Sequence, residues 1–510
     1  MKKSLKFAIG ALVFIGLLAI GFLVFNNYAE KKIRASLETS LKKVNASFEK
    51  VDVKVLNRKA EIFQPEFRFK GKVLKVDTIE IDNIHLWDYL TKKNLIIGDL
   101  NISNPVIKIY NLPSDDQSDT IPKKPEKETE FKNEVLLKRV KISGGSFEIF
   151  EKDSSQHRLF TSLKKLRMEN VHINARTVKE SVPFDYELIR MYCDSLFYDL
   201  DDRHTMTAST FEMDNFDILT TDFRIIPKYS RAEHQKTIRV EKDRYNLKID
   251  TIRLNNFNWN VDKDTMEITN SFTEIRGGDF RIYRDKLQPD DPSIKPMYSK
   301  TIRELPIKLG IDSVRVSHVY LRYEEKVRQG REPGLVEFSG LNGTIYHLSN
   351  IGMGRKAFPE THVIAHANLM KQAPASMDLK FNIADKSDRF EVSGSMNDLQ
   401  ASQINNFLEP AMNVKAEGVI QSMNYYFAGN AYQAQGNMKV AYQDFKVEVL
   451  KKDGSEKNKI VSALANLIVK NKALSEKADY KSIEVQRDRS KSFWNYLWTC
   501  IKNGALKTFL

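Results

Sequence analysis

Residues 140–149 read VKISGGSFEI, two short runs of alternating apolar and polar residues on either side of Gly144 and Gly145. The pattern of this stretch recurs three times in the chain. In every copy, apolar residues occupy offsets 0, 2, 7 and 9, and Ser or Asn occupies offset 3. Alternation with a period of two indicates strands that present one apolar face. The other copies are LNISNPVIKI at 100–109, IRLNNFNWNV at 252–261 and VRVSHVYLRY at 314–323.

A turn at offsets 4 and 5 would make each copy a hairpin in which offset 2 faces offset 7 and offset 0 faces offset 9. Gly144-Gly145 suits a two-residue turn, whereas Asn104-Pro105 does not, because proline cannot take the positive φ of a type I′ turn. Some copies are therefore expected to be bulged bends, since a bulge also returns the next apolar residue to the same face. Either geometry gives one apolar and one solvated face. The hairpin would pair Val140 with Ile149, Ile142 with Phe147, Leu254 with Trp259 and Val316 with Leu321.

Many one-sided strands need a cover, and the sequence between residues 51 and 447 has little helical pattern to supply one. Such a sheet can pack against a second sheet or curl on itself. We therefore expect a mainly β fold: an N-terminal transmembrane helix, an elongated, curled, antiparallel-rich β-sheet that forms a groove, and short C-terminal helices. Separate β-sandwich domains are the alternative. An apolar groove is stable in water only when something apolar, such as an acyl chain, occupies it.

The apolar offsets of the repeated pattern are the candidate lining of this groove. Acyl chains would be held by burial of apolar area, at roughly 25 cal/mol per Å², without head-group chemistry. Packing in an ordinary protein core is the competing explanation for each residue. The candidates are Ile102, Ile107, Ile142, Phe147, Leu254, Trp259, Val316 and Leu321.

The N-terminus contains a candidate membrane span. Residues 7–25 (FAIGALVFIGLLAIGFLVF) carry no charge and would extend about 28 Å as a helix, close to the thickness of a bilayer core. A cleaved signal peptide has a shorter apolar stretch that ends in a small-x-small site, and neither feature is found here. We therefore expect a retained, single-pass signal anchor. Basic residues flank the span on both sides, so charge does not decide its orientation.

The organisation of the chain follows from changes in its periodicity. Alternation begins near Val51, a Pro- and charge-rich tract interrupts the strands after Leu112, and the C-terminal part favours helices. The expected parts are a cytoplasmic N-terminus (1–6), the transmembrane anchor (7–25), a helical stalk (26–48), an N-terminal β module (49–111), a disordered linker (112–134), a central β-groove region (135–385), a C-terminal β segment (386–450) and C-terminal helices (451–510).

The final segment, SFWNYLWTCIKNGALKTFL at 492–510, has the pattern of an amphipathic helix. Trp together with Lys in such a segment is typical of a helix that lies in a membrane interface. A terminal helix docked on the sheet core is an equal alternative. The candidate membrane-interface residues are Phe493, Trp494, Leu497, Trp498 and Ile501.

Signatures of catalysis are scarce. His362 and His366 have a helical metal-ligand spacing, but the surrounding THVIAHANL alternates like a strand and has no Glu beside the first His. Cys193 and Cys500 form no CxxC pair. The net charge of +13 is spread over mixed-sign runs, without the basic, aromatic-rich stretch of nucleic-acid binders. We expect no catalytic residues, no metal site, no cofactor and no nucleic-acid partner.

Two segments resemble one known family. IEIDNIHLWDYLTKKNL at 79–95, followed by IIGDLNISNPVIKIY at 96–110, is similar to the N-terminal module of AsmA-like proteins. Residues 394–452, with strands that begin at Gly418, Gly429 and Gly436 and the closing phrase YQDFKV at 442–447, resemble the last segment of that family. The resemblance covers both ends of the β-rich region and extends only in style to residues 177–305.

This resemblance implies a bacterial envelope protein that is anchored in the inner membrane and has its bulk in the periplasm. AsmA-like proteins are similar to bridge-type lipid transfer proteins and are linked to outer-membrane assembly and lipid homeostasis. The family would therefore imply a non-enzymatic β-groove that binds phospholipid or another envelope lipid and helps to move it between membranes, with outer-membrane assembly or other envelope proteins as partners. The alternative function is a membrane-tethered β-sandwich scaffold that binds envelope proteins without carrying lipid.

Overall fold

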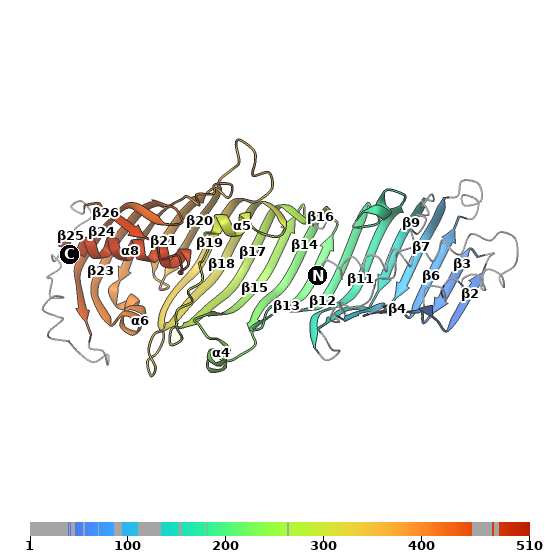
Figure 1. Cartoon of the computed structure of the whole chain (residues 1–510), viewed down its shortest axis with the longest axis horizontal. Helices are drawn as coiled ribbons and strands as arrows, with labels where there is room; N and C mark the ends of the chain where they lie inside the picture. The colour runs from blue at the N-terminus through green and yellow to red at the C-terminus, as the bar shows by residue number, and fades with distance from the viewer. Residues whose placement is uncertain are drawn as a thin grey trace, which may run out of the picture. The chain divides into compact units, whose positions relative to one another are not determined.

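The computed structural model describes residues 39, 41, 46–54, 57–69, 71–85, 94–110, 134–151, 156–180, 182–262, 265–450, 472–473 and 479–509. These residues are mainly β-strands with a few short helices, which confirms the expected fold class at this level (Figure 1). They form two compact units: unit 1 is Met1–Asp222 with Asn260–Met266, and unit 2 is Phe223–Trp259 with Glu267–Leu510. The predicted anchor (7–25), nearly all of the stalk (26–48), the linker (all but Glu134) and residues 451–471 lie outside the described residues.

Unit 1 is built mostly from short strands in two hydrogen-bonded ladders. Its strands are β1 (Ala46–Ser47), β2 (Lys50–Lys54), β3 (Lys59–Phe63), β4 (Glu66–Phe69), β5 (Lys72–Lys75), β6 (Thr78–Ile84), β7 (Leu95–Ser103), β8 (Val106–Tyr110), β9 (Val135–Ser143), β10 (Ser146–Phe150), β11 (His157–Ile173), β12 (Leu188–Asp199) and β13 (His204–Asp214).

The long strand β11 belongs to both ladders of unit 1. One ladder runs β2–β3–β6–β7–β9–β11–β12–β13, and the other runs β1–β4–β5–β8–β10–β11. Apolar side chains of both ladders, together with Leu41, form one closed core. Phe67, Ile97 and Leu100 are fully buried in it.

The two copies of the repeated pattern in unit 1 bend at offset 4. There the backbone is left-handed, with φ 49° at Asn104 and 71° at Gly144, and Asn and Gly are the residues that tolerate this conformation best. Residues before the bend lie in the first ladder and residues after it in the second. The copies pair with each other in parallel, Leu100 opposite Val140 in one ladder and Ile107 opposite Phe147 in the other.

The hairpin is therefore wrong for the copy at 140–149. The copies at 100–109 and 314–323, whose central residues Asn104-Pro105 and His318-Val319 do not suit a two-residue turn, form the bulged bend that is the other expectation. Ile142 pairs with Ile102 and Leu166 instead of Phe147. Val140 pairs with Leu100 and Met168 instead of Ile149. Val316 and Leu321 lie on one continuous strand, with a bulge between them. In the copy at 252–261, Leu254 pairs with Thr273 and the left-handed residue, Asn256, again occupies offset 4.

Among the described residues, unit 2 contains the longer strands and the α-helices α4, α5, α6 and α8. Its elements are α4 (Arg231–Thr237), β15 (Asp243–Asn255), β17 (Thr265–Asp285), α5 (Tyr298–Arg303), β18 (Lys308–Lys326), β19 (Gly334–Ser349), β20 (Thr361–Leu369), β21 (Ala373–Phe381), β22 (Phe390–Gln400), α6 (Ala401–Met412), β23 (Val414–Gly429), β24 (Gln433–Val449), β25 (Lys472–Ala473), β26 (Lys481–Gln486) and α8 (Phe493–Phe509). The chain passes between the units within β14 (Asp217–Pro227), β16 (Asn258–Asp262) and β17.

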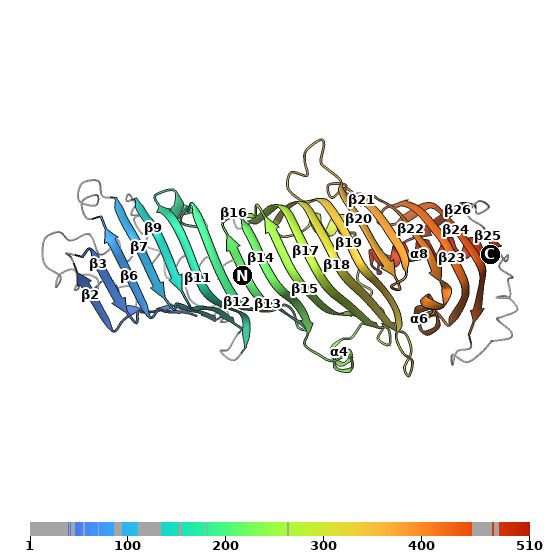
Figure 2. The same ribbon diagram turned by 180° about the vertical axis from the view of Figure 1, so that it is seen from behind.

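The sheet of unit 2 follows the order β15–β17–β18–β19–β20–β21–β22–β23–β24–β26 (Figure 2). Its described pairings are antiparallel except for β17 with β18, which run in parallel. The expectation of an antiparallel-rich sheet is confirmed, and the parallel pairs of both units make the sheets mixed.

His318 shows how one residue keeps a long strand one-sided. Its φ is 56°, and the bulge around it moves the apolar positions of β18 from Val314 and Val316 to Val319 and Leu321 without changing the face they occupy. We expect His318→Val to destabilise β18 by about 1–2 kcal/mol, because the left-handed region tolerates His but strongly disfavours a β-branched side chain.

His318→Gly is the matched control, since glycine adopts this φ freely and keeps the backbone N–H that donates to Asn342 Oδ1. Amide hydrogen exchange of β18 and β19 measures both variants. Equal protection in the valine and glycine variants would contradict the assigned role of the left-handed bend.

Candidate functional site

The candidate site is one face of the unit 2 sheet, which we call the apolar face. Directly opposed residues of neighbouring strands share a face, so the registers define cross-strand rows on it. Row A is Leu247, Phe280, Leu321, Phe338 and Leu369; row B is Ile252, Ile275, Val316, Gly343 and Ala365; row C is Thr273, Val314, Ile345, Val363, Leu379, Val392 and Phe427.

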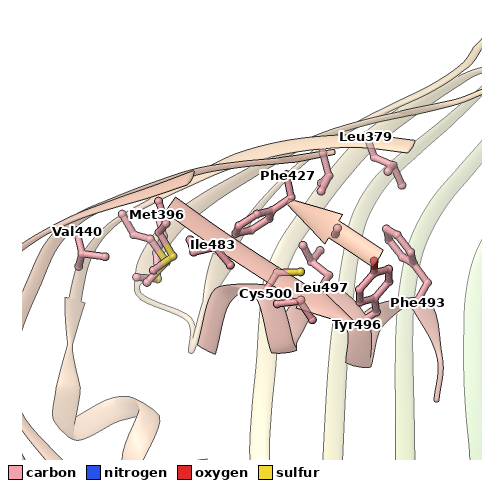
Figure 3. Close-up of a cluster of buried hydrophobic side chains, with 14 of the residues drawn as sticks. Leu379, Met396, Phe427, Val440, Ile483, Phe493, Tyr496, Leu497 and Cys500 are labelled. Carbon is pink, nitrogen blue, oxygen red and sulfur yellow. The ribbon is translucent and has the colours of Figure 1, made fainter. Parts of the chain in front are cut away.

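The two ends of the apolar face differ in how they are covered. Towards β22–β26, row C ends in a closed core in which Val392 and Phe427 are completely buried. Helix α8 lies against this part, and its Phe493, Tyr496 and Leu497 point towards the strands (Figure 3). This end of the face is sealed by protein.

Over β15, β17 and β18, rows A and B of the apolar face are only half-buried, whereas Thr273 and Val314 of row C are buried. All five residues of row A, and all five of row B, retain intermediate exposure. Among the described residues, neither of the two closed cores contains a side chain from these three strands. Half-exposed Ile and Phe in continuous rows form an extended apolar surface.

The opposite face of the same strands is polar. Thr251, Arg276 and Ser317 form the row next to row B, one residue along each strand. Arg315 lies over the ring of Phe272, with its guanidinium carbon 5.3 Å from the ring centroid. The strands of unit 2 are therefore one-sided, as their alternation predicts.

A rim of ion pairs and tyrosines ends the apolar face at one edge. Asp243 accepts two hydrogen bonds from Arg284, at 2.6 and 2.8 Å, and the Tyr323 hydroxyl donates to Glu325 at 2.6 Å. Burial raises the pKa of Tyr245 to about 12, with the nearby Asp243 carboxylate adding to the shift. Tyr245 and Tyr323 lie two residues beyond row A along their strands, and Asp243, Arg284 and Glu325 lie four residues beyond it. The apolar face therefore ends in charged side chains at this edge.

The predicted lining residues fall into two groups. In unit 1, Ile102 and Ile142 are 2% and 5% exposed within the closed core, and Ile107 packs against that core. Phe147 is half-buried and pairs with Ile107.

In unit 2, Leu254, Trp259, Val316 and Leu321 are all half-buried. Val316 and Leu321 lie in rows B and A, and Leu254 pairs with Thr273 of row C. Sequence reasoning missed most of the rows, including Ile275, Phe280 and Phe338, because β17 and β19 do not repeat the offset pattern. The alternation of apolar and polar residues within β17 and β19 themselves was the signal that could have identified these residues.

Helix α8 places its predicted interface residues on two sides. Phe493 and Leu497 are buried against the sheet, together with Tyr496 and Cys500, while Ile501 is half-buried. Trp494 and Trp498 are 50% and 37% exposed. The ring of Trp498 meets Phe407 of α6 edge-on at 6.0 Å, and that of Trp494 meets Tyr298 at 6.3 Å. One side of the helix is thus docked, and its two tryptophans remain partly open to solvent.

The described residues contain no group of three or more His, Cys, Asp or Glu side chains that could hold a metal ion. His362 contacts Asp378 across the strands, with Nε2 2.9 Å from Oδ2. Within the same part of the chain, no helix has the length and apolar character needed to cross a membrane.

Comparison with known proteins adds no family to this geometry: no protein-family model and no curated protein matches the chain.

Proposed function

We propose that the apolar face of unit 2 binds the acyl chains of phospholipid or another envelope lipid. The observation that carries this proposal is the continuous half-buried surface of rows A and B over β15, β17 and β18. Each methylene group buried there would contribute about 0.8 kcal/mol, so a chain that lies across several strands would bind without head-group contacts. A mixture of acyl lengths would suit such a surface.

The setting of this lipid-binding face is also a proposal. The apolar segment 7–25 and the resemblance to AsmA-like proteins support an anchor in a bacterial inner membrane, with the β-rich bulk in the periplasm. A curled sheet would then form a groove that helps to move lipid between membranes and so contributes to outer-membrane assembly. No step of this proposal requires catalysis or a cofactor.

Native mass spectrometry of the full chain tests the proposal. The protein is extracted from a host with ordinary phospholipids in a mild detergent, and the bound lipid is then identified. We expect bound phospholipid on the folded chain, because rows A and B run without a break across β15, β17 and β18. A folded chain that carries no lipid in several detergents would overturn the proposal.

A membrane-tethered scaffold is the second candidate function. The closed core of unit 1 and the sealed end of unit 2 favour it, since fully buried faces leave no room for lipid. The lipid-free result of the same experiment supports this candidate.

We further propose that the exposed tryptophans of α8 lie in a membrane interface. Trp494 and Trp498 are expected to be quenched by brominated phospholipids when the full chain is reconstituted in vesicles, because indole rings favour the headgroup region. Replacing Trp87 and Trp259 by Phe isolates their fluorescence, as the chain has four tryptophans. The matched control replaces all four tryptophans by Phe and carries Phe216→Trp, at an exposed position outside both proposed contacts. Quenching that does not exceed that of a soluble tryptophan would refute the interfacial position.

A further inference from the structure

Helix α8 covers the same face of the sheet that is open over β15, β17 and β18. Row B continues from Ala365 through Met377 and Gly394 to Tyr425 and Met438. Met438 is completely buried beneath α8, where a Cβ at Gly504 would lie 3.1 Å from the Met438 Cβ. The helix therefore occupies the continuation of the surface to which we assign acyl chains.

The contact between α8 and the sheet is mainly apolar, with one hydrogen bond from Lys507 Nζ to the backbone oxygen of Ser482 at 3.0 Å near the end of the helix. Phe493, Leu497 and Cys500 are held by burial of their apolar surface. This interaction is non-directional, so another apolar group can take their place on the sheet. The Tyr496 hydroxyl is buried in this contact and has no hydrogen-bond partner among the described residues. An unpaired buried hydroxyl opposes docking, because it forgoes the hydrogen bonds that water would offer.

The segment before α8 is held by specific polar contacts instead. Lys491 Nζ lies 3.0 Å from Glu241 Oε1 and 2.9 Å from Asp290 Oδ2. Arg487 donates to the backbone oxygen of Lys295 at 2.7 Å, and the Lys295 N–H donates to Arg489 at 2.8 Å. We call residues 487–491 the strap. The strap fixes the base of α8 to unit 2, whereas the helix itself rests mainly on apolar contacts that other apolar groups can replace.

We propose that α8 is a displaceable cover, which leaves β22–β24 when acyl chains advance along row B and returns when they withdraw. The inference rests on the proposed lipid-binding function. The strap keeps the helix attached during this exchange, so docking and release are intramolecular. Acyl chains and α8 compete for one surface of the sheet. Each methylene group that is buried there offsets part of the free energy lost when the apolar side chains of α8 leave the sheet.

Photo-crosslinking with a locked helix tests the proposal. The full chain, with Cys193 and Cys500 replaced by Ala, is reconstituted in vesicles of palmitoyl-oleoyl phosphatidylethanolamine and phosphatidylglycerol. Met438→Cys with Gly504→Cys provides a disulfide that holds α8 on the sheet. p-Benzoylphenylalanine at Tyr425 reports lipid under the helix, and the same probe at Ile252 reports lipid on the open rows.

We expect lipid adducts at Tyr425 in the reduced protein and only background labelling in the oxidised protein, with Ile252 labelled in both. Two results would overturn the displaceable cover and leave the proposed function intact. One is equal labelling at Tyr425 in the reduced and the oxidised protein, and the other is no labelling at Tyr425 while Ile252 is labelled. Absence of adducts at Ile252 would instead overturn the proposed function.

Tyr496→Phe gives an independent readout that needs no disulfide. Removing the unpaired hydroxyl favours the docked helix, so labelling at Tyr425 is expected to fall by about fivefold or more. Labelling that stays the same or rises in this variant would contradict the competition between helix and lipid.

Discussion

Glutamate at Ile275 and Val316 together is expected to remove bound phospholipid from the full chain while leaving it folded. These positions are directly opposed in row B and half-buried, so the new carboxylates reach water when the face is empty. Bound acyl chains would exclude that water, and burying an unpaired carboxylate costs several kcal/mol. Native mass spectrometry should therefore show a lipid-free chain, and circular dichroism an unchanged β signal.

The matched control places the same charges on the opposite face. Thr251→Glu and Ser317→Glu lie on the same sheet, one residue from row B, and are expected to leave lipid binding unchanged. Normal lipid content in the folded Ile275→Glu, Val316→Glu variant would remove these residues from the site. Unfolding of that variant would show that the face is sealed, because only a closed core forces the carboxylates out of water.

Phe427→Ala is expected to destabilise the sealed end of unit 2 by about 3–5 kcal/mol, the usual cost of truncating a fully buried phenylalanine. Phe427 is completely buried in row C, and its ring stacks on that of Tyr425 at 5.4 Å. Gly436 opposite it leaves space for the ring, since a Cβ there would come within 2.8 Å of Phe427 Cδ1. Hydrogen exchange of the β22–β24 amides measures the loss as a lower free energy of opening.

Phe280→Ala, in row A, is the matched comparison for the destabilisation expected from Phe427→Ala. Phe280 is half-buried and stacks on Tyr245 at 6.0 Å. Its truncation is expected to cost about 1–2 kcal/mol, because part of the ring already contacts solvent. A cost equal to that of Phe427→Ala would mean that the two ends of the apolar face are equally closed.

Alternation predicted the one-sided strands well, because side chains that follow each other on a strand must point to opposite faces. It could not predict which strand each one pairs with. Val140 to Ile149 satisfies a hairpin and a bend equally, and the choice depends on whether Gly144 begins a tight turn or only inserts a left-handed residue. The copy with Asn104-Pro105 was the more informative one, since proline excludes the turn that two glycines permit.

The docked side of α8 shows a second limit. Its apolar arc includes Trp494 and Trp498 as well as Phe493 and Leu497. The pattern therefore predicts an amphipathic helix, but it does not predict which part of the arc contacts protein. The sheet decides this, because Tyr496 and Cys500 belong to the same closed core as Phe427 and Met438 of the strands. Likewise, Ile142 and Val316 occupy the same offset of the repeated pattern. Ile142 is buried because it lies in the closed core of unit 1, whereas Val316 is half-buried.

The parallel pairing of the copies at 100–109 and 140–149 has a consequence for how such a sheet can change in length. Their partners differ by 40 in residue number at every offset, as in 100 with 140 and 109 with 149, and the left-handed residues 104 and 144 coincide. A tandem duplication of this 40-residue segment would place a third bend in the same register. Internal duplication could thus widen the sheet by whole modules, whereas insertion of one residue before a bend would turn the apolar side chains of that strand to solvent.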